Sequence, residues 1–119
     1  MNKLLFSTKS LTEADGANEP FELEYFIVEN HTAGENINIS TYGIEIVKTV
    51  RSDNIKYTEA KTAHELGTSE TDVYNIAKLL SDNLVTPMTL RDIIEDMIAE
   101  GRLATAMEQS ILDGMLQVV

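Results

Sequence analysis

The chain has 119 residues, of which 43% are hydrophobic and 24% are charged, so it resembles an ordinary globular protein rather than a disordered one. At this length we expect a single domain over residues 1–119, with a β part over about 1–60 and a helical part over about 69–117. The 20 acidic and 9 basic residues give a net charge of -11, which repels nucleic-acid phosphates and anionic lipids. The lack of cysteine excludes disulfides and thiolate chemistry.

Targeting and membrane signals are not expected in this sequence. The segment 1–6 is too short to supply the apolar region of a signal peptide. No stretch approaches the ~20 apolar residues that a membrane-spanning helix needs. The prediction is therefore a cytoplasmic protein without a membrane partner.

The first half of the chain has the period of β-strands. Residues 21–29 alternate apolar and acidic side chains, which predicts a strand with one buried face. A second extended run over 37–50 follows a turn-like segment and predicts a hairpin. The apolar residues of this run have odd numbers up to Ile39 and even numbers from Tyr42 onward. One extra residue would explain the change, so we expect a bulge near residues 40–43 that uses Gly43.

Two further strands complete the predicted β part. A third run over Ile55–Thr58 follows a tight turn, and residues 3–8 could add an edge strand. Residues 13–20 carry small and polar residues without an apolar pattern, which predicts a loop. The first half is therefore expected to be an antiparallel meander of three to four strands.

Helical spacing replaces the strand period after residue 68. Ser69 followed by Asp72 is typical of a helix N-cap, and the first helix is expected to end near Asn83 or Leu84. Pro87 starts a second helix that ends at Gly101, and a third helix is predicted over 104–117. The apolar stripe of the second helix consists of Leu90, Ile93, Ile94, Met97 and Ile98. The fold class is thus α+β, with two to three helices packed on one face of the meander.

No motif predicts catalysis, a cofactor or a metal site. His31 and His64 lack a second ligand at metal spacing, and neither a Gly-x-Ser-x-Gly run nor a phosphate-binding glycine loop is present. The acidic residues of the second helix could form a cation or acid–base site, but they also suit a solvated helix face. These residues are Asp92, Glu95, Asp96 and Glu100.

Residues 62–78 are similar to a helix-turn-helix motif of bacterial regulators. A small residue, Leu66, Gly67 and a later Val73 have the spacing of that motif. However, the positions that would enter the major groove include Glu70 and Asp72 and no arginine, which opposes DNA binding. The motif is therefore kept as an alternative only.

Two stretches carry a resemblance to a known family. Residues 42–48 form a Tyr-Gly-Ile strand, and residues 83–96 contain a Val-Thr-Pro turn followed by an acidic helix. Together they resemble a small family of anaerobic spore-forming bacteria that has only a domain-of-unknown-function label. The similarity is expected to cover about residues 21–98 and agrees with the α+β prediction. The resemblance implies no activity, and the helix beyond Gly101 is expected to be an extension.

The leading functional hypothesis is a non-enzymatic protein-binding module with a regulatory or adaptor role. The alternatives are a transcription-associated regulator that uses residues 62–78 and a small cation-binding or catalytic carboxylate domain. The C-terminal segment is more apolar than a terminal helix of so small a domain requires, so it either completes the core or forms a surface for a protein partner or a homodimer. That surface would consist of Met107, Ile111, Leu112, Met115 and Leu116.

Overall fold

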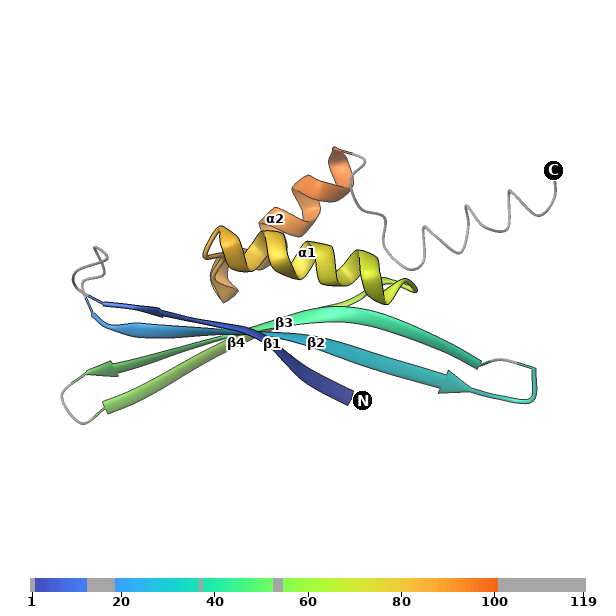
Figure 1. The fold of residues 1–119 in the computed structure, drawn as a ribbon, viewed down its shortest axis with the longest axis horizontal. Helices are drawn as coiled ribbons and strands as arrows, with labels where there is room; N and C mark the ends of the chain where they lie inside the picture. The colour runs from blue at the N-terminus through green and yellow to red at the C-terminus, as the bar shows by residue number, and fades with distance from the viewer. Residues whose placement is uncertain (1, 13–18, 37, 53–54, 101–119) are drawn as a thin grey trace.

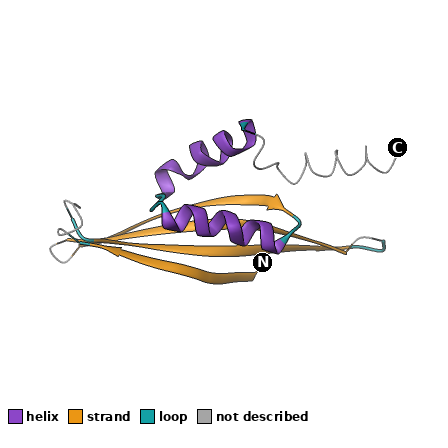
Figure 2. Cartoon of the chain, turned by 45° about the horizontal axis from the view of Figure 1, so that its top comes forward, coloured by secondary structure: helices purple, strands orange, loops and turns teal. Residues whose placement is uncertain are grey.

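The computed structural model describes residues 2–12, 19–36, 38–52 and 55–100. Four strands precede two helices, in the order β1 (Asn2–Leu11), β2 (Phe21–Ala33), β3 (Asn38–Ser52), β4 (Ile55–Gly67), α1 (Glu70–Asp82) and α2 (Pro87–Ala99). The strands form one antiparallel sheet in the order β1-β2-β3-β4. Both helices lie on the same face of this meander, as Figures 1 and 2 show. The α+β prediction is confirmed.

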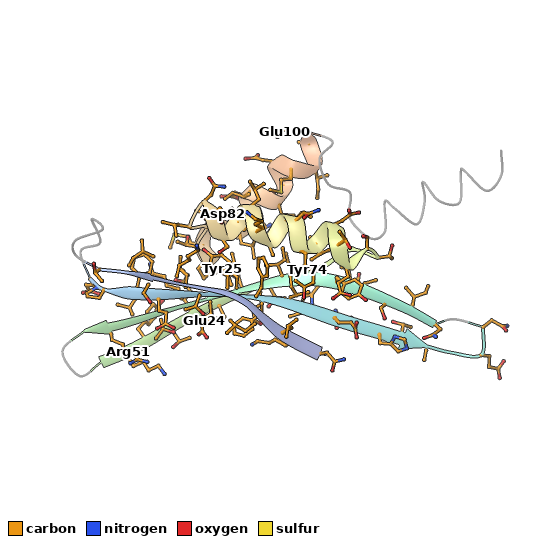
Figure 3. All side chains as sticks on the ribbon, in the orientation of Figure 1. Glu24, Tyr25, Arg51, Tyr74, Asp82 and Glu100 are labelled. Carbon is orange, nitrogen blue, oxygen red and sulfur yellow. The ribbon has the colours of Figure 1, made fainter. Side chains whose placement is uncertain are left out.

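The alternating pattern of β2 decides which face of the sheet is covered. Its odd-numbered residues Leu23, Tyr25 and Ile27 are buried and belong to the hydrophobic core. Figure 3 shows Tyr25 between the sheet and the helices. Ile44 and Ile46 of β3 pair with Ile27 and Tyr25 and join the same core. The other face of the sheet carries no helix of the described chain and is called the open face below.

The predicted bulge lies in a different strand pair. The register between β2 and β3 runs without interruption, so no residue is inserted near Ser40, and Ile39 is simply exposed, at 48%. The irregularity separates β3 from β4, where the pair Tyr42↔Gly67 is followed by Ile44↔Ala63. The extra residues therefore belong to β4, and among them Glu65 has a positive φ of 54°.

Gly43 does mark this irregular site, because of a close approach between strands. A Cβ at this position would collide with the backbone carbonyl oxygen of Ala63. Glycine is needed here for space, since it lets β3 pass the distorted end of β4.

The helices begin where the sequence predicts. The Ser69 side chain caps α1 by accepting a hydrogen bond of 3.2 Å from the Asp72 backbone N–H. Pro87 occupies the first turn of α2, where its missing N–H costs nothing. The buried side of α1 consists of Val73, Ala77, Leu80 and Ser81, and that of α2 consists of Pro87, Leu90, Ile94 and Met97.

Two hydrogen bonds tie the helical layer to the sheet. The buried Tyr25 hydroxyl donates to the Val85 carbonyl oxygen at 2.8 Å, which holds the link between the helices against β2. Ser81 of α1 donates to the Ser7 hydroxyl of β1 at 2.9 Å. In this layer α1 packs over all four strands, whereas α2 packs over β3 and β4.

The fourth strand is much longer than expected, because it runs from Ile55 to Gly67 rather than ending at Thr58. The predicted third helix over 104–117 lies outside the described residues, as does most of the predicted loop over 13–20. Neither helix of the described chain is long and apolar enough to cross a membrane.

Candidate protein-binding surface

A groove runs along the free edge of β4. This strand pairs with β3 on one side, and among the described residues no strand pairs with its other side. The groove has a volume of about 430 Å³ and touches three successive residues, Lys61, Thr62 and Ala63. Successive strand residues point to opposite faces, so a groove that meets all three lies at the edge of the strand. We call it the edge groove.

The second wall of the edge groove is α2. Its apolar lining comes from Pro87, Leu90, Ile94 and Met88, and the Met88 side chain is 76% exposed. Arg91 lies at the rim and forms an ion pair of 3.0 Å with Glu95. The groove therefore combines an apolar interior with a rim that carries both signs of charge.

The helix-side row of β4 leads into this groove. Ala63 pairs with the core residue Ile44, and the regular register then places Lys61, Glu59 and Tyr57 on the same side of the sheet. The Tyr57 side chain is 56% exposed, and its pair with Val50 is the third from the β3–β4 turn. The sequence analysis does not identify this row. The signal available in the sequence is Glu59-Ala60-Lys61, which places two opposite charges on one face of a strand.

A second groove, the interhelix groove, lies between α1 and α2. It has a volume of about 390 Å³ and an apolar lining that consists of Leu79, Leu80, Val85, Ile93 and Met97. Leu79 is 42% exposed, so this surface is only partly covered by the described chain. The groove reaches Glu100, where the described part of the chain ends.

A polar cluster on the open face connects three strands. Lys3 forms an ion pair with Glu45 at 2.5 Å, and Thr62 donates to the same carboxylate at 2.9 Å. Burial works to raise the pKa of Glu45, but Lys3, Thr62 and the nearby His64 together hold that pKa below its ordinary value. The Lys3 ammonium also lies 4.3 Å from the centre of the Phe26 ring. These contacts join β1, β3 and β4 and give the partly buried Glu45 carboxylate two partners.

The two histidines and the carboxylates of α2, which the sequence offers as candidates for catalysis or metal binding, do not come together in the fold. His31 lies 2.9 Å from the Ser40 hydroxyl near the end of the β2–β3 hairpin, and His64 is exposed at the irregular end of β4. In the carboxylate set of α2, Glu95 is paired with Arg91, and Asp96 lines the interhelix groove. Within the described residues, no group of three His, Cys, Asp or Glu side chains could hold a metal ion.

The helix-turn-helix interpretation of residues 62–78 does not match the fold. Residues 62–67 belong to β4, and α1 begins only at Glu70. The segment therefore contains a strand and one helix, without the first helix of the motif. The predicted association surface from Met107 to Leu116 lies outside the described residues.

The fold defines an α+β protein in which a four-stranded antiparallel meander carries two C-terminal helices on one face. The chain belongs to a family of unknown function (DUF6514), whose model matches residues 1–100. This confirms the resemblance to an uncharacterised family and extends it to include β1. The match ends at the end of α2, so residues 101–119 lie beyond it. No curated protein and no solved structure matches the sequence.

Proposed function

We propose that this protein is a non-enzymatic protein-binding module of the cytoplasm, with a regulatory or adaptor role, and that one of its partners is a second copy of itself. The observation that carries the proposal is the edge groove, in which apolar side chains of α2 lie beside the edge of β4 that no other strand of the described residues pairs with. Partners recognise such a pair of features readily, because a strand edge offers main-chain hydrogen bonds and the neighbouring groove accepts side chains.

The electrostatics of the chain support a protein partner over nucleic acid. A net charge of -11 opposes phosphate backbones, and the helix that follows β4 begins with Glu70 and Asp72. The rim of the edge groove, by contrast, carries Lys61 and Arg91 together with Asp92 and Glu95. A rim of mixed sign favours a protein surface that also presents both charges.

The experiment that tests the proposal is sedimentation equilibrium of the full chain over a range of protein concentrations. We expect a concentration-dependent shift from the mass of a monomer to that of a dimer. A chain that stays monomeric at every concentration would refute self-association.

Truncation after Gly101 locates the contact. If the predicted surface from Met107 to Leu116 holds the dimer, the truncated chain stays folded and becomes monomeric. If the described domain holds it, the truncated chain keeps the mass of a dimer. A truncated chain that is unfolded would assign the tail to the core instead.

A further inference from the structure

We infer that two copies of this chain associate edge to edge through β4, in an antiparallel register centred on Ala60, to form a continuous eight-stranded sheet. The inference rests on the proposed function and identifies its partner and its surface. Such a dimer has a two-fold axis perpendicular to the sheet, which keeps the helices of both copies on the same side. It also satisfies the outer main-chain groups of β4 over residues 57–63, an edge with which no strand of the described residues pairs.

The alternation of side chains restricts the possible registers. Residues opposite each other in an antiparallel pair lie on the same face of the sheet, so the axis must pass through a residue and not between two residues. The pairing of β4 with β3 is regular from Ile55 to Ala63 and becomes irregular beyond it. A register centred on Ala60 uses residues 57–63, which all lie within the regular part.

Charge selects Ala60 from the neighbouring centres. In this register Lys61 of each copy lies opposite Glu59 of the other, so two pairs of opposite charge form on the helix side. A register centred on Glu59 would place the Glu59 carboxylates of the two copies opposite each other. A register centred on Lys61 would place the two Lys61 ammonium groups opposite each other. On the open face, Ala60 meets Ala60 at the axis and Thr58 meets Thr62.

The same register fills the edge groove. Tyr57 of one copy lies opposite Ala63 of the other, and Ala63 is part of the groove lining beside Ile94 and Met88. The exposed Tyr57 ring thus gains an apolar site, and the exposed Met88 side chain gains a neighbour. One arrangement accounts for the free edge, the groove and both exposed apolar side chains.

Lysine on a strand edge usually prevents association, because an unrelated strand leaves its charge without a partner. Lys61 therefore opposes pairing with most other strands, whereas a second copy of this chain places Glu59 opposite it. The edge of β4 is therefore expected to pair with β4 of another copy in preference to unrelated strands.

A charge-swap experiment tests the register. Glu59→Lys and Lys61→Glu each place like charges across the axis, and we expect each single variant to dimerise at least about tenfold more weakly than the wild type, since two pairs change from attraction to repulsion. An equimolar mixture of the two single variants restores opposite charges in both pairs and should recover the dimer. The double variant should also recover it, because its two charges are exchanged within one chain.

Tyr57→Ser tests the groove, with Ile39→Ser as the matched control. Both positions are exposed apolar residues on strands, but only Tyr57 lies within the proposed contact. We expect weaker dimerisation for Tyr57→Ser and unchanged dimerisation for Ile39→Ser. Circular dichroism of each variant verifies that the monomer is folded.

The outcomes separate this inference from the proposed function. A wild-type chain that never dimerises refutes both the β4 register and self-association, and leaves the binding of another protein to be tested separately. A wild-type dimer that tolerates each single charge reversal, or a mixture that fails to restore association, refutes the β4 register while self-association stands. Truncation after Gly101 should leave the dimer intact, and loss of the dimer on truncation would assign the contact to the tail.

Discussion

Tyr25 shows how one hydroxyl group can hold two layers together. Its ring is buried in the core, and its hydroxyl donates to the Val85 carbonyl in the link between the helices. Tyr25→Phe keeps the ring and removes this bond, so the free energy of unfolding should fall by about 1 to 2 kcal/mol. Urea unfolding measures the change, and Tyr74→Phe, which keeps the edge-to-face contact of that ring with Phe6, is the control.

The raised pKa of Tyr25 predicts that the stability of the fold decreases at high pH. Burial raises the pKa of Tyr25 to about 12 from the ordinary value of 10.0. The folded chain therefore retains a proton that the unfolded chain loses, so the free energy of unfolding is unaffected below pH 10.0 and falls as the pH rises toward 12. The loss is about 1.4 kcal/mol for each pKa unit. Tyr25→Phe removes this component, so the advantage of the wild type should shrink in alkaline solution.

Gly43 offers a second test at the residue scale, with a matched control in the same protein. Gly43→Ala would drive a methyl group into the Ala63 carbonyl, so we expect destabilisation of about 1 to 3 kcal/mol. Gly34→Ala has open space around the new methyl group and should change stability by less than about 1 kcal/mol. Equal thermal stability of the two variants would show that β3 and β4 do not approach closely at this point.

At the scale of elements, α2 depends on one apolar side. Ile94 is buried against the sheet, whereas Met88 on the same helix is exposed. Ile94→Asp should destabilise the fold by several kcal/mol because it buries an unpaired charge, and Met88→Asp should have little effect on the dilute monomer. The melting temperatures of the two variants provide the comparison. An unchanged value for Ile94→Asp would show that this side of α2 is not in the core.

The elements that the sequence predicts well are those with a strong local pattern. The alternation in β2 and the Ser69 and Pro87 start signals place β2, α1 and α2 to within a few residues. The length of β4 was missed because residues 59–66 contain helix formers and no alternation of apolar side chains. Pairing with β3 overrides those local preferences, and the apparent helix-turn-helix came from the same segment.

The candidate binding surface was less predictable than the fold, for a physical reason. The edge groove arises where β4 and α2, which are separated in sequence, come together, and no local pattern encodes that contact. The exposed positions of Tyr57 and Met88 also depend on the tertiary packing. The charges of Glu59 and Lys61 were present in the sequence, but their meaning depends on knowing that β4 is an edge strand.

At the scale of the whole molecule, the two edges of the sheet can be compared directly. β1 and β4 are both edge strands of the described sheet, but only β4 lies beside the edge groove and carries the self-complementary charges. If two copies associate as inferred, the β4 edge is covered in the dimer and the β1 edge stays exposed. The two strands therefore form an internal comparison within one sample.

Backbone amide hydrogen exchange of the full chain, measured at increasing protein concentration, tests the central claim most directly. We predict that protection of the amides in residues 57–63 rises with concentration, in step with the dimer mass, while protection of the β1 amides stays constant. Dimer formation that leaves β4 protection unchanged, or that protects β1 instead, would contradict the account.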